Sequence, residues 1–396
     1  METVLEPSTC ATGQEFTRQL NESAQSIALV KKLVAEKLTG KVIDIDLKSE
    51  YPEQFLRELG QAGGFRGAML PEYGGNGLGL KHVIQVMEEV SKVCLSTGFL
   101  VWAQTACARY IELSTNESVK QKFLPLIASG EQLVGTGLSN TIKSSHEVEE
   151  YRLSARRVEG GYLINGVLPW VSNLGAKHFF TTGCPVEGEP KGNNGLVYVL
   201  VDCSQPNFKL VDCAHFVAID GTRTLACHFK DTFIPNAMVL SHPGESAAYT
   251  ARIMPAMVLA QMGMGLGLID DCVAMMKQSN RTHSHVNQYL DDQADVIEAV
   301  LTEARASTYA LADTYQKNLP SVSMLDILKL RLAGGEYALK AANSAMLHMG
   351  AKGYLQKSPA QRRLREAYFI AVVTPATKHL RAKIAQLEAP ATCAPA

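Results

Sequence analysis

The spacing of apolar and polar residues changes twice along this 396-residue chain. Over residues 1–133, apolar side chains recur every three or four positions in two long stretches, 22–38 and 81–113, which predicts amphipathic helices. Between them lies the glycine-rich stretch 67–80, GAMLPEYGGNGLGL. No strand-like run precedes it and no GK[ST] follows, so a turn between helices is a better interpretation than a phosphate loop. The first region is therefore predicted to be an all-helical domain.

From residue 134 to 243 the pattern becomes strand-like. Short runs rich in Val, Tyr, Phe and Thr are separated by turns of Gly, Asn and Pro. The sequences EGG at 159–161 and NG at 165–166 are hairpin signals. These features predict a small antiparallel domain, either a barrel or a sandwich.

Helical spacing resumes in the last region, residues 244–396. Four long amphipathic stretches with short connections predict a four-helix bundle, at 249–278, 295–316, 323–350 and 358–373. The predicted fold class is therefore α+β, with an N-terminal helical domain, a central antiparallel β-domain and a C-terminal four-helix bundle.

Charge and cysteine content restrict the partners and the compartment. Lys and Arg total 38 and Asp and Glu total 39, which gives no electrostatic reason to expect nucleic acid or an anionic membrane as a partner. The chain shows neither a signal peptide nor an apolar run approaching the roughly 18 residues of a membrane span. The nine cysteines are scattered, without a C-x-x-C, so we expect free thiols in the cytoplasm. His283 and His285 have no nearby acid or cysteine, and we predict no metal site.

Several motifs occur in an order and spacing that a known family shares. They are LPEYGGNGLG from Leu70, KQKFLPLIASGEQLVGTGLS from Lys120, YLINGVLPWVSNLGAKHFF from Tyr162, HMGAKGY from His348 and RRLREAYFIAVV from Arg362. In these segments the chain resembles the acyl-CoA dehydrogenase superfamily across nearly its whole length. The resemblance implies FAD as cofactor, bound between the β-domain and the helical bundle in a flat, largely apolar slot with a few donors at the ring edges.

The resemblance assigns roles to two residues near the NG turn. Trp170 and Ser172 fall on the family's W-x-T, where the Trp stacks beside the flavin and the hydroxyl hydrogen-bonds its N5 edge. Ser172 keeps that hydroxyl, so it is a candidate for both cofactor binding and catalysis. Without the family, Trp170 would be interpreted as a core aromatic of a strand.

A second cofactor-binding segment is altered. LSNTIKSSH, residues 138–146, falls on the family's x-T-E-P-x-x-G-S-D, a loop that offers backbone N–H groups and hydroxyls to the flavin and its pyrophosphate. On this alignment Leu138, Ser139 and Ser145 are candidate cofactor ligands. Asn140, Ser144 and His146 replace the family's acid, glycine and aspartate, and a solvent-facing loop histidine is the simpler interpretation of His146.

The adenosine end of the cofactor is matched less well. The family uses an R-x-x-F-G to reach a neighbouring subunit's FAD, and here Arg281 or Lys277 is the candidate, through its charge. Gly350 matches the first glycine of the family's G-G pair, but Ala351 replaces the second. The expected cofactor is FAD, with FMN as the alternative.

The family's usual catalytic base is missing. Counting without a gap from Gly350 puts Arg365 on the family's R-D-A arginine and Thr374-Pro375-Ala376 on its E-G-T. That Glu removes the α-proton of an acyl thioester while the β-hydride passes to the flavin. Pro375 still breaks the helix, because a residue before proline is pushed out of the α region. An unassisted Thr374 hydroxyl is too weak a base near pH 7, and losing a general base costs on the order of 10²–10⁴-fold.

Two other positions could carry a base. Some family members carry it on the first bundle helix, but the place near Ile253 has no carboxylate, and the nearest is Glu245 in the preceding turn. A different acid, or His379, is the alternative that keeps a base in the site. Thr374, Ser172 and His379 are therefore the candidate catalytic residues.

These departures favour a change of chemistry. Several flavin monooxygenases resemble the family, lack the Glu and use reduced flavin and O₂ in the same slot. We therefore expect a flavin-dependent oxygenase acting on a small organic or thioester substrate, with a separate flavin reductase as partner. The alternatives are a dehydrogenase or oxidase of acyl-CoA or acyl-carrier protein with a relocated base, and a catalytically silent flavin-binding scaffold. Because the family's cofactor site is completed by a neighbour, we expect a homotetramer or homodimer.

Overall fold

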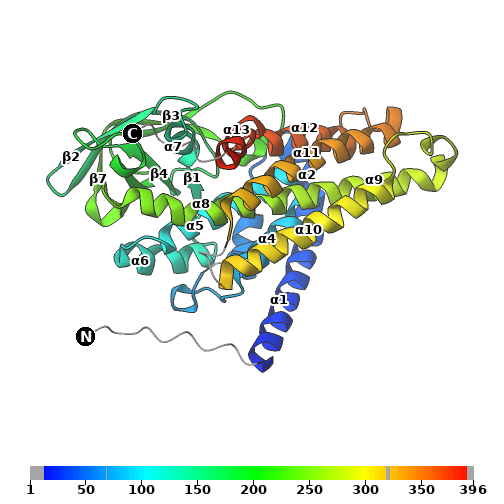
Figure 1. The fold of residues 1–396 in the computed structure, drawn as a ribbon, viewed down its shortest axis with the longest axis horizontal. Helices are drawn as coiled ribbons and strands as arrows, with labels where there is room; N and C mark the ends of the chain where they lie inside the picture. Colours follow the sequence, from blue (N-terminus) through cyan, green and yellow to red (C-terminus); the bar gives the residue numbers. More distant parts are fainter. Residues whose placement is uncertain (1–12, 68, 318–321, 390–396) are drawn as a thin grey trace.

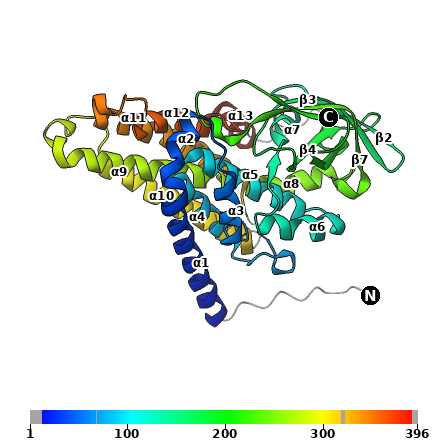
Figure 2. The same cartoon turned by 180° about the vertical axis from the view of Figure 1, so that it is seen from behind.

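The computed structural model describes residues 13–67, 69–317 and 322–389. Strands gather at one end of the molecule and long helices extend to the other, as Figure 1 and the opposite view in Figure 2 show. Helices, then sheets, then helices follow one another in chain order, as the sequence predicts.

Within residues 13–67 and 69–133, the N-terminal region forms six α-helices. The predicted helix at 81–113 is two helices, because Lys92–Cys94 interrupts it. The glycine-rich stretch is a turn as predicted, with a 3₁₀ turn at Pro71–Tyr73 that ends on Gly74 at φ +81°. The helices are α1 (Gly13–Leu33), α2 (Val42–Leu47), α3 (Glu53–Gln61), α4 (Gly79–Ser91), α5 (Leu95–Glu112) and α6 (Glu117–Ala128).

The central region is two four-stranded sheets packed around a shared core. One sheet has the order β1-β4-β5-β8 and the other β2-β3-β7-β6. Neighbouring strands pair antiparallel as predicted, except that β1 runs parallel to β4. The strands are β1 (Val134–Thr136), β2 (Leu153–Val158), β3 (Gly161–Val171), β4 (Phe179–Pro185), β5 (Leu196–Asp202), β6 (Phe208–Asp212), β7 (Leu225–Pro235) and β8 (Val239–Ser241).

Only one of the two hairpin signals marks a turn. Glu159-Gly160 joins β2 to β3, as predicted. The prediction for Asn165-Gly166 is wrong, because this pair lies inside β3 at a register shift between Ile164 and Gly166. Gly166 has φ +122°, and a Cβ there would lie 2.1 Å from the Arg152 carbonyl oxygen. The glycine therefore serves a bulge and a close backbone approach.

The C-terminal region is a bundle of long helices. The predicted helix 249–278 is α8 and α9, which meet at Gln261. Ser323 and Ser358 cap their helices by accepting from Asp326 N and Ala360 N, as expected for N-cap serines. The helices are α8 (Ser246–Ala260), α9 (Met262–Asn287), α10 (Ala294–Lys317), α11 (Met324–Met349), α12 (Pro359–Val372) and α13 (Thr377–Glu388).

Two glycines let α9 pack directly against α4. A Cβ at Gly263 would lie 2.8 Å from the Ile84 carbonyl oxygen, and one at Gly267 would lie 2.4 Å from that of Glu88. Both approaches are shorter than real Cβ atoms show, so the two helices meet backbone to backbone. The N-terminal helices and the C-terminal bundle consequently share one continuous apolar core.

The α8–α9 stretch is apolar enough to pass a length-and-composition test for a membrane span. It covers Ser246–Asn287, and 83% of its most apolar 18-residue window is buried inside the fold. The stretch is longer and more apolar than the sequence pattern suggested, and its burial is that of a core helix.

The cysteines in the described part of the chain are all free thiols, as expected. Six of these seven are buried and Cys213 is half-buried. Cys10 and Cys393 lie outside the described residues.

Candidate active site

A cavity of about 690 Å³ opens between the central sheets and the helices. Its walls come from α5, α8 and α12, from the helix α7 (Leu138–Ser145) and from the segments around Trp170 and Phe216. The volume is within the range of about 300–1,000 Å³ that is typical of small-molecule and cofactor sites. This cavity is the candidate active site.

Aromatic side chains close its helical side. The Phe99 ring stacks on Trp102, with centroids 5.5 Å apart and planes at 12°, and meets the edge of Phe369 at 4.7 Å. Trp102 Nε1 donates to the Met257 carbonyl oxygen at 3.1 Å. Because that bond uses the only donor of the indole, this end of the cavity presents a fixed apolar surface.

The opposite side combines an exposed aromatic face with hydroxyl groups. The Trp170 side chain is 57% exposed and contacts the edge of Phe216 at 6.1 Å. Ser172 Oγ lies 2.6 Å from Thr224 Oγ1, which lies 2.8 Å from Thr222 Oγ1. This open aromatic face lines the cavity and can therefore accept a flat ring.

The segment 138–146 is not the predicted loop. Leu138–Ser145 forms the helix α7, which starts after Gly137 at the end of β1. Leu138 and Ser139 line the cavity from its first turn, where helix N–H groups lack intrahelical acceptors. The positive end of the helix dipole is therefore available to an electron-rich ring edge. Asn140 is used structurally instead, because its amide bonds Glu149, Glu150 and Arg152.

Thr374 reaches the cavity from the predicted helix break. The helix α12 ends at Val372 and α13 begins at Thr377, with Pro375 between them. Thr374 Oγ1 lies 2.7 Å from Ser139 Oγ. Within the described ranges, no residue lining the cavity is Asp, Glu or His. The hydroxyl pair therefore occupies a site that has no protein carboxylate to act as a base.

Arg365 is a cavity residue that the sequence did not single out for the site. Its guanidinium donates to both carboxylate oxygens of Asp46, at 3.0 and 2.5 Å, and to the Val217 carbonyl oxygen at 2.7 Å. It thereby connects α12, the N-terminal helix α2 and the cavity-lining segment 216–219, which we call the roof of the cavity. No sequence signal could have joined two residues 319 positions apart.

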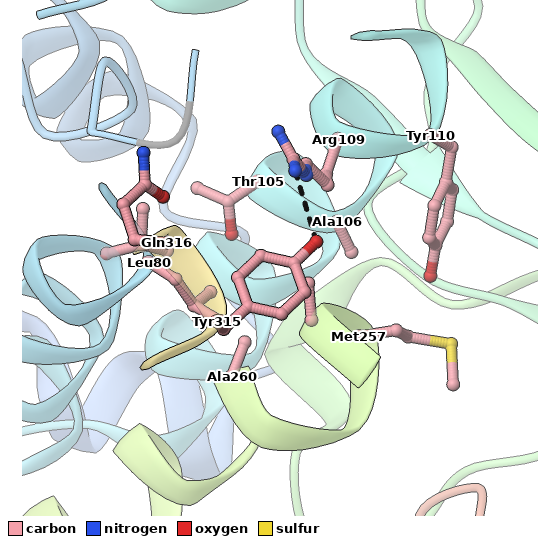
Figure 3. A pocket seen from close by; sticks show the side chains of 11 residues that line it. Leu80, Thr105, Ala106, Arg109, Tyr110, Met257, Ala260, Tyr315 and Gln316 are labelled. Atoms are coloured by element: carbon pink, nitrogen blue, oxygen red, sulfur yellow. Dashed lines mark hydrogen bonds between the residues drawn. The ribbon is translucent and has the colours of Figure 1, made fainter. Parts of the chain in front are cut away.

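A second cavity is far smaller. It has a volume of about 20 Å³ and shares Met257 with the large one. Figure 3 shows Arg109 donating to the Tyr315 hydroxyl, at 3.1 Å, across this space. A single water needs about 10–15 Å³, so the smaller cavity can hold little more than that. Of these two cavities, only the larger has room for a cofactor and a substrate.

Comparison with known proteins finds similar sequences in one family. Residues 21–131 match the family model for the acyl-CoA dehydrogenase N-terminal domain. The mitochondrial isovaleryl-CoA dehydrogenase of Oryza sativa subsp. japonica is 24% identical over 380 residues, which cover 91% of this chain and 92% of that protein. The short-chain specific acyl-CoA dehydrogenase of Clostridium acetobutylicum is 24% identical over 86% of this chain and 91% of that one. In these matches the chain resembles the acyl-CoA dehydrogenase superfamily over nearly its whole length.

Solved structures share the fold. A glutaryl-coenzyme A dehydrogenase in complex with glutaryl-CoA superposes with a TM-score of 0.84 at 22% identity, covering 92% of this chain and 95% of that one. The prolyl acyl carrier protein oxidase AnaB superposes with a TM-score of 0.80 at 17% identity, covering 96% and 99%.

His379, the candidate that would keep a base in the site, does not line the cavity. Its side chain is 7% exposed, and its ring meets that of His146 edge-on at 4.9 Å. Burial, with His146 and Lys383 as nearby positive groups, lowers the pKa of His379 to about 4. His146 is half-buried rather than solvent-facing, and its Nδ1 lies 2.8 Å from the Ile142 carbonyl oxygen. Whether His379 acts in catalysis stays a prediction.

The other predicted ligands lie away from the cavity. Ser145 donates to the Ile142 carbonyl oxygen, at 2.9 Å. Arg281 is exposed near the end of α9, and Gly350 and Ala351 are exposed where α11 ends. These two helix ends lie together, since Ser279 donates to the His348 carbonyl oxygen, and they point away from the β-sheets in Figure 1. In one chain the structure brings together Leu138, Ser139, Trp170, Ser172 and Thr374, and leaves the other candidates outside.

Proposed function

We propose that the large cavity binds FAD and that the protein is a flavin-dependent oxygenase. Support for the cofactor comes from the slot itself. The open face of Trp170 suits the flat ring, and Ser172 and Ser139 offer hydroxyl groups at its edges. The first turn of α7 adds unpartnered N–H groups and a positive dipole end. Bound FAD would supply hydride acceptance and, when reduced, electrons for O₂.

The observation that carries the proposal is the absence of a base where the superfamily uses a carboxylate. Thr374 stands there, paired with Ser139 in a cavity whose described lining has no Asp, Glu or His. A hydroxyl pair can donate a hydrogen bond and orient a substrate, but it does not remove an α-proton near pH 7. Oxygenation needs no such base. It needs a dry, fixed cavity, which Phe99, Trp102 and Phe369 provide.

The walls also restrict the substrate. They are mainly aromatic and aliphatic, and both cations among them already have carboxylate partners, Lys143 with Glu149 and Arg365 with Asp46. We therefore propose an uncharged reacting group, from a small organic molecule or the acyl part of a thioester, oriented by the hydroxyls of Ser139 and Thr374.

The test is anaerobic titration of the purified holoprotein with butyryl-CoA and octanoyl-CoA. We expect the visible flavin absorption to persist in the wild type. Thr374→Glu should gain a trace of bleaching, and Thr374→Gln, which matches it in size but carries no charge, should gain none. Restoring a general base is worth on the order of 10²–10⁴-fold, and Pro375 limits the gain by fixing the backbone.

O₂ consumption provides the second arm. The chemically reduced wild type should consume O₂ and form oxygenated product, and Thr374→Glu should form less of that product. The substitution places an ionisable group beside the flavin, and burial raises the pKa of its carboxylate. Rapid bleaching of the wild type with stoichiometric enoyl-CoA would contradict the proposal and return the search to His379, Glu245 and His146.

A second candidate is an oxidase or dehydrogenase that acts on a carrier-bound or CoA-bound acyl group with a relocated base. The similarity to the prolyl acyl carrier protein oxidase AnaB over nearly the whole chain favours it, as does the similarity to a structure described as PigA with FAD and proline, which superposes with a TM-score of 0.82 at 15% identity. Bleaching by a carrier-bound aminoacyl or acyl thioester, but not by free CoA thioesters, would identify this activity.

Three further elements remain part of the proposal. A separate flavin reductase would reduce the cofactor, and the enzyme would work in the cytoplasm as a homodimer or homotetramer. Arg281, Gly350 and Ala351, far from this chain's own cavity, would then serve the adenosine end of a neighbour's FAD. A silent flavin-binding scaffold is the remaining alternative, and its spectrum would not respond to any substrate.

A further inference from the structure

Among the residues that the structure describes, Arg331 is a buried cation without a carboxylate partner. It lies on α11 and its side chain is 1% exposed. None of the ion pairs found in the described part of the chain involves it, and burial lowers its pKa to about 10. Placing an unpaired charge inside a protein is costly, so a residue of this kind needs a specific set of acceptors.

Its acceptors are the end of α12 and one glutamine. One guanidinium nitrogen donates to the Ile370 carbonyl oxygen, in the last turn of α12, where carbonyl groups lack intrahelical partners. A cation at this position also interacts favourably with the negative end of the helix dipole. Nε donates to Gln261 Oε1 at 2.8 Å.

Gln261 passes this contact on to Thr374. It sits where α8 meets α9 and is 1% exposed. Because arginine can only donate, the oxygen of the Gln261 amide must face Arg331 and its NH₂ group must face away. That NH₂ group donates to the Thr374 carbonyl oxygen at 2.9 Å. The Thr374 carbonyl group is thereby fixed by Gln261, while its hydroxyl group contacts Ser139 Oγ in the cavity.

The residue type at position 261 is informative. A glutamate would give Arg331 the counter-charge that it lacks. A carboxylate has no donor, however, and would place an acceptor against the Thr374 carbonyl. Only the amide satisfies both neighbours.

We propose that Gln261 and Arg331 are positioning residues that hold Thr374 in the active site. The inference rests on the proposed function only in that Thr374 is taken to face bound FAD and substrate. The two residues touch neither, and they act by fixing the non-helical Val373–Pro375 segment.

Gln261→Glu separates positioning from stability. We expect the thermal midpoint to be kept or raised, because Arg331 gains an ion pair, and the Thr374 contact to be lost. The readout is the Thr374 methyl signal in a spectrum of threonine-methyl-labelled apoprotein, assigned by its disappearance in Thr374→Val. Gln261→Glu should move this signal.

Gln361→Glu is the matched control. Gln361 also accepts from an arginine Nε, that of Arg365, at 2.8 Å, but it does not touch Thr374. It should leave the Thr374 methyl signal in place. Arg331→Lys is a second variant in case Gln261→Glu does not fold. The ammonium keeps a charge at the end of α12 but cannot reproduce the planar fork, so the signal should move again.

A double-mutant comparison in the FAD-loaded protein completes the test. The probe is the rate at which O₂ reoxidises the chemically reduced flavin. Gln261→Glu should change this rate by a few-fold to about 100-fold, the scale of a misplaced site group, and far less in a Thr374→Val background. An unmoved methyl signal in both variants, or an equal rate effect in both backgrounds, would overturn the inference. If the protein binds no FAD, the proposed function fails, while the methyl spectrum still decides whether Gln261 and Arg331 position Thr374.

Discussion

Replacing Asp46 by asparagine should loosen the roof of the cavity. The carboxylate of Asp46 receives two hydrogen bonds from Arg365, which also donates to the Val217 carbonyl oxygen. An asparagine keeps one acceptor and turns an NH₂ group toward the guanidinium. Asp46→Asn therefore removes one hydrogen bond and the charge attraction, and frees a cation that lines the cavity.

The size of the effect follows from the burial of the pair. The side chains of Asp46 and Arg365 are 7% and 25% exposed. Breaking a fully buried pair costs about 3–5 kcal/mol and an exposed pair about 0–1 kcal/mol, so we expect a loss of about 2 kcal/mol in the free energy of unfolding. With an unfolding entropy of about 2.1 cal/mol/K per residue over 396 residues, this corresponds to a fall of about 2–3 °C in Tm.

The assay is thermal unfolding of three proteins, with and without added FAD. Asp44→Asn is the matched control, since Asp44 lies on the same short helix and pairs with Lys48 at the surface, at 2.8 Å. We expect no measurable change in the control, and a lower Tm together with weaker flavin retention in Asp46→Asn. Equal Tm values for the two variants would refute the reasoning, because they would mean that burial of the Asp46–Arg365 pair contributes nothing.

Three further predictions concern the cofactor, pH and assembly. Ser172→Ala removes one hydroxyl of the Ser172–Thr224 pair and should change the reductive and oxidative rates of the flavin more than its retention; unchanged rates would count against this placement. Burial and then His146 lower the pKa of His379 from 6.5 to about 4, so this histidine binds a proton more readily in the unfolded chain than in the folded one. Its contribution to the free energy of unfolding is therefore fully present above about pH 6.5 and is lost as the pH falls toward 4. Urea midpoints at about pH 7.5 and about pH 5 should therefore differ less in His379→Gln than in the wild type, with the exposed His285→Gln behaving as wild type. Light scattering should show a homodimer or homotetramer at micromolar concentration, and a 43.0 kDa monomer would remove the shared cofactor site from the proposal.

The sequence predicted the fold well because hydrophobic spacing reports burial directly. Long amphipathic stretches became α9, α10 and α11, and the strand-like region became two packed sheets. The failures have local causes. Gly166 was interpreted as a turn glycine, but the strand uses its positive φ for a bulge. The segment 138–146 was expected to be a loop because the family's x-T-E-P-x-x-G-S-D motif contains a proline. Thr141 stands at the position of that proline here, and Leu138–Ser145 is a helix.

The candidate site was predictable only in part. Trp170, Ser172, Ser139 and Thr374 were found through motif spacing, and the structure brings all four to one cavity. The contacts that hold them were not predictable. Arg365 with Asp46 and Arg331 with Gln261 are joined across 319 and 70 residues, and no local pattern reports such pairs. Hydrogen-bond partners of buried cations depend on tertiary packing, which composition and periodicity do not encode.

The backbone contact between α9 and α4 limits how this chain could be recombined with its relatives. The boundary near residue 243 looks like a natural crossover point for a chimera, since the strands end at Ser241 and α8 begins at Ser246. An exchanged C-terminal half, however, would bring its own residues to positions 263 and 267. Any side chain larger than hydrogen there would collide with the Ile84 and Glu88 carbonyl oxygens. A functional hybrid would thus have to inherit α4 and α9 from the same parent, so the unit of exchange in this fold is a pair of helices and not a contiguous half of the chain.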